Sequence, residues 1–485
     1  AMAADICDAF GDTARRLLDL GLGYLSLDRA GSTLSTGERQ RVQLARAVRN
    51  RTTGVLYVLD EPSIGLHAAN VDGLIGVMRD LVADGNSVVV VDHDTRVLEA
   101  CDHLVEMGPG AGANGGRVIA QGAVGEVAGS AASRIAPFLH AAPARVRPCV
   151  GLEGLFDRGR IALSTNRLHT VVPLEVQIPR GRLVAVTGVS GSGKTTLVLE
   201  ELLPALAAAS AGAPLPACVR GLDAEGIARA SLIDATPIGA NVRSTVATYA
   251  GVHDDLRRAF ARTGEAVAAG LKPGDFSYNT GSLRCPVCDG TGSISLDVQF
   301  LPDVEVACPE CRGTRYAPAA DRIHRACADG SLITLPQLMA MSVDEALDAC
   351  CGLKKVVRRL ETLSDLGLGY LSLGEPTPAL SGGEAQRLKL ASEMGRAQSD
   401  AVFVFDEPTI GLHPLDVRTL LSVFDRLVSA GATVVVIEHD LDMIRNADYV
   451  IDMGPGGGED GGRVVFSGPP SDLACCGASV TGRYL

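Results

Sequence analysis

The sequence contains no tryptophan, and it has only 10 Phe and 8 Tyr among 485 residues. Large aromatic platforms that stack the bases of single-stranded nucleic acid are therefore not expected. The sequence also lacks any apolar run of the roughly 18–20 residues that a membrane span requires. Its first five residues show neither the charged nor the apolar region of a secretory signal. We therefore expect a cytoplasmic protein that does not enter a membrane.

Positive charge is also scarce, with 44 Lys and Arg against 57 Asp and Glu and a net charge of −13. This balance excludes a surface that coats nucleic acid uniformly, but a local basic patch stays possible because binding depends on where charge is focused. Of the 13 cysteines, four form one regular cluster and nine are scattered. Scattered thiols are expected to be buried and reduced in the cytosol rather than paired in disulfides.

An internal repeat sets the organisation of the chain. The same motifs recur 346 positions apart: Asp19–Leu27 matches Asp365–Leu373, Leu34–Glu38 matches Leu380–Glu384, Asp60–His67 matches Asp406–His413, and His93 matches His439. A constant spacing over about ninety residues predicts a duplicated domain.

The two copies are unequal, because a phosphate-loop motif, Gly188–Thr195, precedes only the second one. The matching motif of the first copy would lie before residue 1, so we expect the first copy to be partial. Ala1-Met2 favours a fragment of a longer chain, and the alternative is that another chain supplies the rest. The predicted domains are the C-terminal part of the first copy (1–122), a linker (123–155), a second ATPase core (156–203 and 376–485), and an inserted region (204–375) that contains a zinc module (276–316).

The phosphate-loop motif has the context that nucleotide binding requires. An apolar strand ends at Gly188, and a helix is predicted from Thr195 to Leu203, which gives the order strand, glycine-rich loop, helix. The glycines let backbone N–H groups converge on phosphate oxygens, Lys194 would bridge the β- and γ-phosphates, and Thr195 would ligate Mg²⁺. The predicted ligands are Gly188, Ser190, Gly191, Gly193, Lys194, Thr195 and Thr196.

Paired polar residues follow the buried strands of both copies. In each copy one strand ends in two carboxylates, which are Asp406-Glu407 and Asp60-Glu61. The following strand ends in an acid and a histidine, and these histidines are His439 and His93. The first carboxylate of each pair can hold Mg²⁺, and the second can act as general base toward water. Since ligands of α/β folds bind at the carboxyl ends of strands, we expect both histidines to contact a γ-phosphate. The predicted catalytic residues are Glu407, His439, Glu61 and His93, with Asp406 and Asp60 as metal ligands.

Together with Leu380-Ser-Gly-Gly-Glu384, these motifs resemble the set found in ABC ATPases. The resemblance implies an α/β fold of tandem P-loop cassettes, the first partial, in which the signature of one cassette caps the nucleotide of the other. The signature residues are Ser35, Gly37 and Glu38 in the first copy and Ser381, Gly382, Gly383 and Glu384 in the second. Thr36 replaces a glycine and is expected to weaken the first signature. One composite site is complete, so we expect this chain to bind one ATP well.

The regular cysteines form two Cys-x-x-Cys knuckles, Cys285/Cys288 and Cys308/Cys311, separated by 19 residues. This spacing predicts a tetrahedral four-thiolate zinc site within a helical signature region. Four thiolates leave no open position, so the zinc is expected to be structural. A disulfide or a redox pair is the alternative.

The residues around the knuckles narrow the family. Phe276–Asn279, Phe300–Asp303 and Thr236–Gly239 resemble the corresponding segments of the UvrA family, the damage-sensing subunits of the excinuclease. The resemblance implies ATP-dependent recognition of distorted or drug-modified duplex DNA in nucleotide excision repair, with ATP, Mg²⁺ and Zn²⁺. It also implies a homodimer, and a downstream repair protein that binds to a region before residue 1. Arg243, Lys272 and Arg284 are candidate phosphate contacts, and solvated surface charge is the alternative for each.

Departures from the family pattern favour a diverged paralogue. Ala235 stands where the family has a glutamine that positions water, and Asp275 stands where it has a basic residue. The alanine predicts weaker ATP hydrolysis, and the aspartate predicts weaker DNA contacts. The alternative function is a nucleotide-binding regulatory or drug-resistance module with weak ATPase activity and no role in excision. A membrane-transporter motor conflicts with the zinc insertion.

Overall fold

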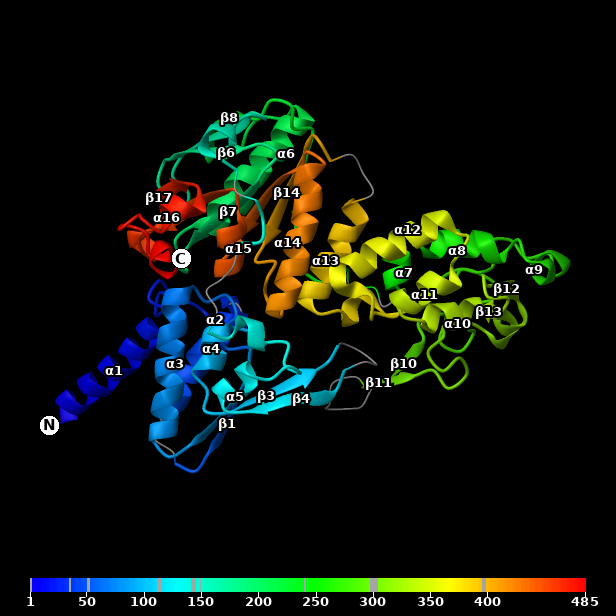
Figure 1. Cartoon of the computed structure of the whole chain (residues 1–485), viewed down its shortest axis with the longest axis horizontal. Coiled ribbons are helices and arrows are strands. Elements are labelled where there is room, and N and C mark those ends of the chain that lie inside the picture. The colour runs from blue at the N-terminus through cyan, green and yellow to red at the C-terminus, as the bar shows by residue number, and fades with distance from the viewer. Residues whose placement is uncertain are drawn as a thin grey trace. The chain divides into compact units, whose positions relative to one another are not determined.

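The computed structural model of the chain describes residues 2–34, 36–49, 53–110, 115–140, 145–148, 150–239, 241, 243–296, 304–394 and 398–485. Packing divides these residues into two compact units (Figure 1). The first unit contains the described residues of Ala1–Pro109, Gly116–Asp234 and Ala397–Leu485, and most of the second lies in Ala235–Arg396. Residues 204–234 therefore pack with the ATPase core, and the described part of 376–396 packs with the inserted region.

The first unit contains the strands of both copies of the repeat. Its strands are β1 (Leu56–Asp60), β2 (Ser87–Val91), β3 (Leu104–Gly108), β4 (Arg117–Gly122), β5 (Arg160–Thr165), β6 (Glu175–Pro179), β7 (Leu183–Gly188), β8 (Val219–Asp223), β9 (Arg229–Ile233), β14 (Ala401–Asp406), β15 (Thr433–Ile437), β16 (Tyr449–Gly454) and β17 (Arg463–Gly468). Its main helices are α1 (Met2–Asp19), α2 (Thr36–Arg49), α3 (Ala68–Ala83), α4 (Thr95–Glu99), α5 (Val124–Ala128), the π-helical η5 (Thr196–Leu202), α6 (Leu203–Ala211), α14 (Pro414–Ser429), α15 (Leu441–Asn446) and α16 (Pro470–Leu473). Shorter 3₁₀ turns are η1 (Gly31–Thr33), η3 (Ala136–Phe138), η4 (Leu152–Gly154), η9 (Gly458–Asp460) and η10 (Thr481–Tyr484).

The second copy is built on a six-stranded sheet of order β17-β16-β7-β15-β14-β9, in which only the edge strand β17 is antiparallel. Residues of β7, β14 and β15 are almost entirely apolar and buried, as expected for a parallel sheet covered on both faces. The η5–α6 helix covers one face, and α14 covers the other, where Phe424 packs on Phe405 at 4.7 Å between ring centroids. The carboxyl ends of β7, β14 and β15 therefore meet at one edge of the sheet.

The first copy keeps the strand pairing of the second. β1 pairs with β2 as β14 pairs with β15, and β3 pairs with β4 as β16 pairs with β17, with a bulge at the same repeat position. Only one apolar face of β1–β2 is covered, by α3. On the other face Leu56 and Val58 are 60% and 65% exposed, whereas Val402 and Val404 at the matching positions are fully buried under η5–α6. The duplication thus preserves backbone pairing even where burial differs.

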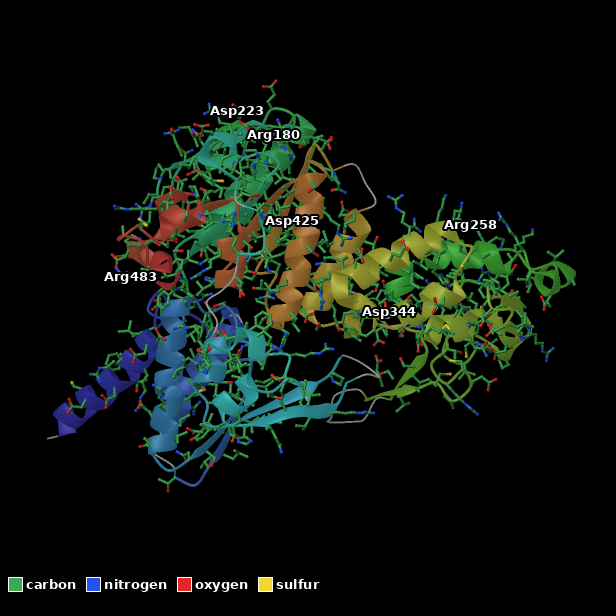
Figure 2. All side chains as sticks on the ribbon, in the orientation of Figure 1. Arg180, Asp223, Arg258, Asp344, Asp425 and Arg483 are labelled. Atoms are coloured by element: carbon green, nitrogen blue, oxygen red, sulfur yellow. The ribbon has the colours of Figure 1, made fainter. Side chains whose placement is uncertain are left out.

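The segment that the sequence predicts as a linker packs onto both copies. α5 and η3 pack against β4 in a small apolar cluster. Further along, the buried Arg147 donates from Nε to Asp425 at 2.6 Å and from Nη1 to the Asn446 carbonyl at 2.7 Å. Asp425 lies on α14 (Figure 2). A buried arginine with both contacts fixes this segment on the second cassette.

The second unit is mainly helical. Its elements are α7 (Val246–Tyr249), α8 (His253–Phe260), α9 (Gly264–Ala268), β10 (Ser293–Leu296), β11 (Val304–Ala307), η6 (Pro318–Arg322), β12 (His324–Ala326), β13 (Leu332–Thr334), α10 (Leu335–Ala340), α11 (Val343–Ala349), α12 (Lys354–Leu363), η7 (Ser364–Leu368), η8 (Thr377–Ala379) and α13 (Gly382–Glu393). Two antiparallel hairpins, β10–β11 and β12–β13, lie among these helices. Within the residues that the structure describes, no helix combines the length and the apolar character needed to span a bilayer.

Candidate functional site

The phosphate loop joins β7 to the η5–α6 helix. Gly188, Gly191 and Gly193 have φ values of 132°, 76° and 96°, a backbone that residues with a β-carbon rarely adopt. The Lys194 ammonium is buried in the loop and donates to the carbonyls of Gly188 at 2.8 Å and Val189 at 2.9 Å. Burial lowers the pKa of Lys194 to about 8, although the carboxylates of Glu407, Asp452 and Asp406 oppose this shift. The loop thus places one cation where strand, turn and helix converge.

A cluster of carboxylates faces this lysine from the ends of β14 and β9. Burial and the neighbouring charges of Glu407 and Asp234 raise the pKa of Asp406 to about 6. A divalent cation bound between buried carboxylates would relieve their mutual repulsion. Thr195, whose hydroxyl is an oxygen ligand of the kind that Mg²⁺ prefers, stands at the start of the helix that follows the loop.

Glu407 and His439 form the acid–histidine pair of the second copy, with Oε1 and Nε2 3.3 Å apart. Burial alone would raise the pKa of Glu407, but the hydrogen bond and charge of His439, with the charges of Lys194 and Arg41, hold that pKa below its ordinary value. Burial and the charge of Lys194 lower the pKa of His439. At neutral pH Glu407 is therefore a carboxylate that can accept a proton, and the histidine is neutral.

The first copy repeats this pair, with Glu61 Oε1 and His93 Nε2 3.5 Å apart. Both glutamates take the left-handed backbone, with φ of 46° for Glu61 and 44° for Glu407, and each donates its N–H to the strand beside it. Asp60 ends β1 as Asp406 ends β14. The acid–histidine geometry is thus the same in both copies.

The acid before each histidine ties it to the loop that follows the two carboxylates. Glu438 accepts hydrogen bonds from the Thr409 hydroxyl at 2.6 Å and from the His439 N–H at 2.9 Å. Asp92 does the same for the Ser63 hydroxyl at 2.6 Å and the His93 N–H at 2.7 Å. Sequence reasoning assigned no role to these acids, although their place before each histidine in both copies was a usable signal.

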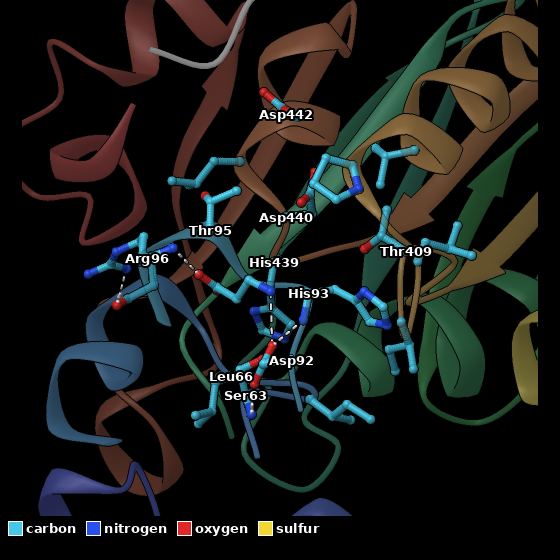
Figure 3. A pocket seen from close by; sticks show the side chains of 18 of the residues that line it. Ser63, Leu66, Asp92, His93, Thr95, Arg96, Thr409, His439, Asp440 and Asp442 are labelled. Atoms are coloured by element: carbon cyan, nitrogen blue, oxygen red, sulfur yellow. Dashed lines mark hydrogen bonds between the residues drawn. The ribbon is translucent and has the colours of Figure 1, made fainter. Parts of the chain in front are cut away.

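Each copy places a histidine close to the acid–histidine pair of the other. The ring of His67, in the first copy, lies 6.0 Å from that of His439, and the ring of His413, in the second, lies 6.4 Å from that of His93. Burial, with the charges of His439 and Lys194, lowers the pKa of His67 to about 3, so this histidine is neutral. Both acid–histidine pairs line one cavity of about 390 Å³. Figure 3 labels the two histidines, His93 and His439, among the residues that line it. The reciprocity was missed from the sequence, although His67 and His413 occupy matching repeat positions.

The first copy also borders the phosphate loop of the second. A β-carbon on Gly191 would stand 2.7 Å from Cγ of Tyr24, which follows α1. The Tyr24 hydroxyl donates to Glu38, a buried residue of the first signature. Gly37 follows Thr36 in the first turn of α2, and Ser35 lies outside the described residues. The two described signature residues thus belong to the segment that is anchored beside this loop.

The second signature begins α13. Ser381 caps the helix: its hydroxyl accepts from the Glu384 N–H at 3.3 Å, and its own N–H donates to the Glu384 carboxylate at 2.7 Å. Gly382 and Gly383 form the first turn, and a β-carbon on Gly382 would stand 3.2 Å from Cβ of Ala235. The alanine in place of the expected glutamine therefore lies against its own signature.

The four regular cysteines are buried and converge in the second unit. Their sulfur atoms lie within 4.8 Å of one another, with Cys285–Cys308 and Cys288–Cys311 separations of 3.9 and 3.6 Å. Four ligands at about 2.3 Å from a tetrahedral zinc would be about 3.8 Å apart. A β-carbon on Gly290 would meet the Tyr278 carbonyl at 1.8 Å, so only glycine fits the turn after the first knuckle. The thiol set fits a closed four-sulfur metal site.

Two of the three candidate DNA contacts converge beside this cluster. Arg243 and Arg284 donate to the two carboxylate oxygens of Asp289, at 2.6 and 2.8 Å. Lys272 is exposed, and its backbone N–H donates to Asp275 at 2.8 Å. The structure thus brings two arginines together through an aspartate that sequence reasoning did not single out.

Comparison with known proteins adds independent evidence. The chain is 45% identical to UvrABC system protein A of Thermus thermophilus over 473 residues, which are 97% of the chain and 49% of that protein. A solved structure of UvrA2 from Deinococcus radiodurans matches with a TM-score of 0.87 and 41% identity, over 100% of the chain and 57% of that structure's chain. The chain spans about half the length of the curated relatives it matches. No protein-family model matches it.

A further solved structure agrees in fold alone. It contains archaeal ABCE1 bound to the ribosome with Pelota, and it matches at 18% identity with a TM-score of 0.55 over 95% of the chain. The predicted α/β architecture of ABC-type repeats is confirmed. The predicted cysteine cluster is present within it.

Proposed function

The chain belongs to the UvrA family over the half of the family's length that it spans, and from this premise we propose that it is an ABC-type ATPase that recognises damaged DNA in nucleotide excision repair. ATP binding and hydrolysis would gate its binding to distorted duplex DNA. The observation that carries the proposal is the composite site, in which Tyr24 of one copy borders the phosphate loop of the other and His67 borders its Glu407–His439 pair. The names of these relatives favour this function over a drug-resistance module.

In the proposed mechanism, residues 188–196 bind the phosphates through backbone N–H groups, and Lys194 exchanges its carbonyl partners for phosphate oxygens. Thr195 and Asp406 would hold Mg²⁺, which neutralises charge on the β- and γ-phosphates. Glu407 would take the proton of the attacking water. The single N–H of the neutral His439, which meets Glu407 in this structure, would turn to the γ-phosphate. Glu61, His93 and Asp60 are proposed to play the same roles in the other site.

The signatures would close the sites. Gly37, Glu38 and Ser35 are proposed to cap the nucleotide held by the second copy, and Ser381, Gly382, Gly383 and Glu384 to cap that of the first. The small residues at both helix starts suit close approach to phosphate, and a helix N-terminus carries the positive end of its dipole. Binding of ATP would therefore draw the two copies together.

The second unit is proposed to contact DNA. Cys285, Cys288, Cys308 and Cys311 would hold a structural Zn²⁺ that fixes the knuckles. Arg243, Arg284 and Lys272 are proposed phosphate contacts, with shape and deformability of the duplex supplying the preference for damage. A second copy of the chain and a downstream repair protein are the proposed protein partners.

The test is the affinity of the chain for a damaged and an undamaged duplex of the same sequence, with and without ATP, over a salt series. We expect a nucleotide-dependent preference for the damaged duplex that weakens as salt rises. Equal binding of both duplexes, with ATP binding intact, would overturn the proposal in favour of a regulatory module.

A further inference from the structure

Arg41 is a buried cation on α2, the helix of the first signature. Its side chain is only 5% exposed, yet among the described residues Nε and Nη1 have no hydrogen-bond partner. Burying a charged group without compensation is strongly unfavourable. A guanidinium kept in such a position therefore indicates an anionic ligand.

The surroundings of Arg41 point to where that anion would lie. Tyr24 and Glu38 are its neighbours, and the Tyr24 ring stands against Gly191 of the phosphate loop. Its charge also reaches the catalytic pair of the second copy. Arg41 is close enough to Glu407 and His439 of that pair to interact electrostatically with both. Arg41 thus approaches the nucleotide site from the opposite copy.

The second signature helix provides an internal comparison. Arg387 stands at the matching repeat position, 346 residues later, and its guanidinium donates to the carbonyls of Gly383 at 3.2 Å and Leu366 at 3.3 Å. The backbone of its own unit therefore satisfies Arg387. Arg387 therefore has backbone partners, whereas two donors of Arg41, at the same repeat position, find no hydrogen-bond partner in the part of the chain that the structure describes. A purely structural role accounts for Arg387 but not for Arg41.

We propose that Arg41 donates hydrogen bonds to the terminal phosphate of a nucleoside triphosphate held by the phosphate loop of the second copy. The proposal rests on the proposed function, because it assigns a partner to the nucleotide of that site. Guanidinium stays charged at all working pH values, and its N–H groups donate strong, charge-assisted hydrogen bonds to phosphate oxygens. A nucleoside diphosphate would leave Nε and Nη1 without a partner. Arg41 would therefore let the first copy distinguish ATP from ADP.

The experiment measures ATP and ADP affinity by calorimetry in a Glu407→Gln parent, which prevents turnover. Arg41→Ala should weaken ATP binding about tenfold or more, the effect of losing a charge-assisted hydrogen bond, and change ADP binding less than about twofold. Arg41→Lys keeps the charge but loses the planar set of guanidinium donors, and it should recover part of the ATP affinity. Arg46→Ala removes the same charge from an exposed position on α2 and should change neither affinity.

Equal weakening of ATP and ADP in both Arg41 variants would overturn the proposal and assign a structural role. Unchanged ATP affinity in Arg41→Ala would overturn it as well. Intact ADP binding in the variants shows that the phosphate loop is folded, so a selective loss of ATP binding supports the contact. A parent that binds neither nucleotide would overturn the proposed function, and this proposal with it.

Discussion

The hydroxyl of Tyr24 donates a hydrogen bond to Glu38, so the glutamate of the first signature is held by the loop that precedes its own helix. Tyr370 and Glu384 repeat the contact in the second copy, 14 residues apart in both cases. The two pairs differ in burial, since Glu38 is buried whereas Tyr370 is 37% exposed. The contact is a feature of the repeat, and we expect its contribution to the free energy of unfolding to differ between the copies.

Tyr24→Phe should lower the free energy of unfolding by about 1–2 kcal/mol, because a buried carboxylate loses a donor that water cannot replace. Tyr370→Phe is the matched control and should cost less than about 0.5 kcal/mol, since water reaches that pair. Urea unfolding measures both. Equal effects would contradict the role assigned to burial.

Glu407→Gln should reduce ATP turnover by about 10²-fold or more while ATP stays bound, because the base is lost and the phosphate contacts are kept. Steady-state phosphate release and retention of labelled ATP measure the two effects. Glu61→Gln is the control: the sequence holds a single phosphate-loop motif, and it precedes Glu407. We therefore expect less than about a twofold change from the control, and comparable losses would show that both acids act in turnover.

ATP affinity should fall as pH rises through the pKa of Lys194. Burial lowers that pKa to about 8, so the ammonium is present below pH 8 and is lost above it. We expect about a tenfold fall in affinity between pH 7 and pH 9 and uptake of a proton on binding near pH 8.5. Calorimetry in two buffers of different ionisation enthalpy measures the uptake. Lys194→Arg stays charged and should take up no proton, and a flat profile for the unaltered chain would contradict the shift.

Cys308→Ser should abolish zinc binding, because three thiolates and a hydroxyl no longer form the four-sulfur set. Metal analysis should find about one zinc per chain before the change and almost none after it. Cys351→Ser removes an exposed thiol of the same unit and should keep the metal. Loss of zinc in both variants, or in neither, would contradict the assigned ligands.

Asp289→Asn should strengthen DNA binding, because it frees Arg243 and Arg284 to contact phosphates. Two added contacts would steepen the slope of log affinity against log salt by about 1.8. Asp254→Asn, which removes a carboxylate that pairs with Arg257 elsewhere in the unit, is the control and should leave the slope unchanged. Weaker DNA binding after Asp289→Asn would show instead that this carboxylate positions the arginines.

The repeat made much of the fold predictable. Motifs at a constant spacing of 346 require the same strands in both copies, and the registers of β1–β2 and β14–β15 do match residue for residue. The spacing of the cysteines likewise placed four thiols together. Such features are predictable because they depend on local sequence period or on ligand geometry.

Contacts between the copies were not predictable in this way. Tyr24 lies within a recognised repeat motif, but nothing in its own segment indicates that it meets Gly191, far along the chain. The approach of His67 to His439 and the burial of Arg41 depend in the same way on how the two copies pack. The predicted helix after Thr195 is present, but its first turns are π-helical, and the apolar pattern of the sequence does not distinguish a π-helix from an α-helix.

The position of Tyr24 against Gly191 gives the chain a thermodynamic linkage. A ligand that binds only when the two copies are docked lowers the free energy of the docked form, and by the same amount docking tightens the ligand. Bound nucleotide should therefore raise the melting temperature of both copies. The first copy should be stabilised even though it has no phosphate-loop motif in this sequence. Nucleotide binding would in this way be measurable as an increase in the thermal stability of both copies.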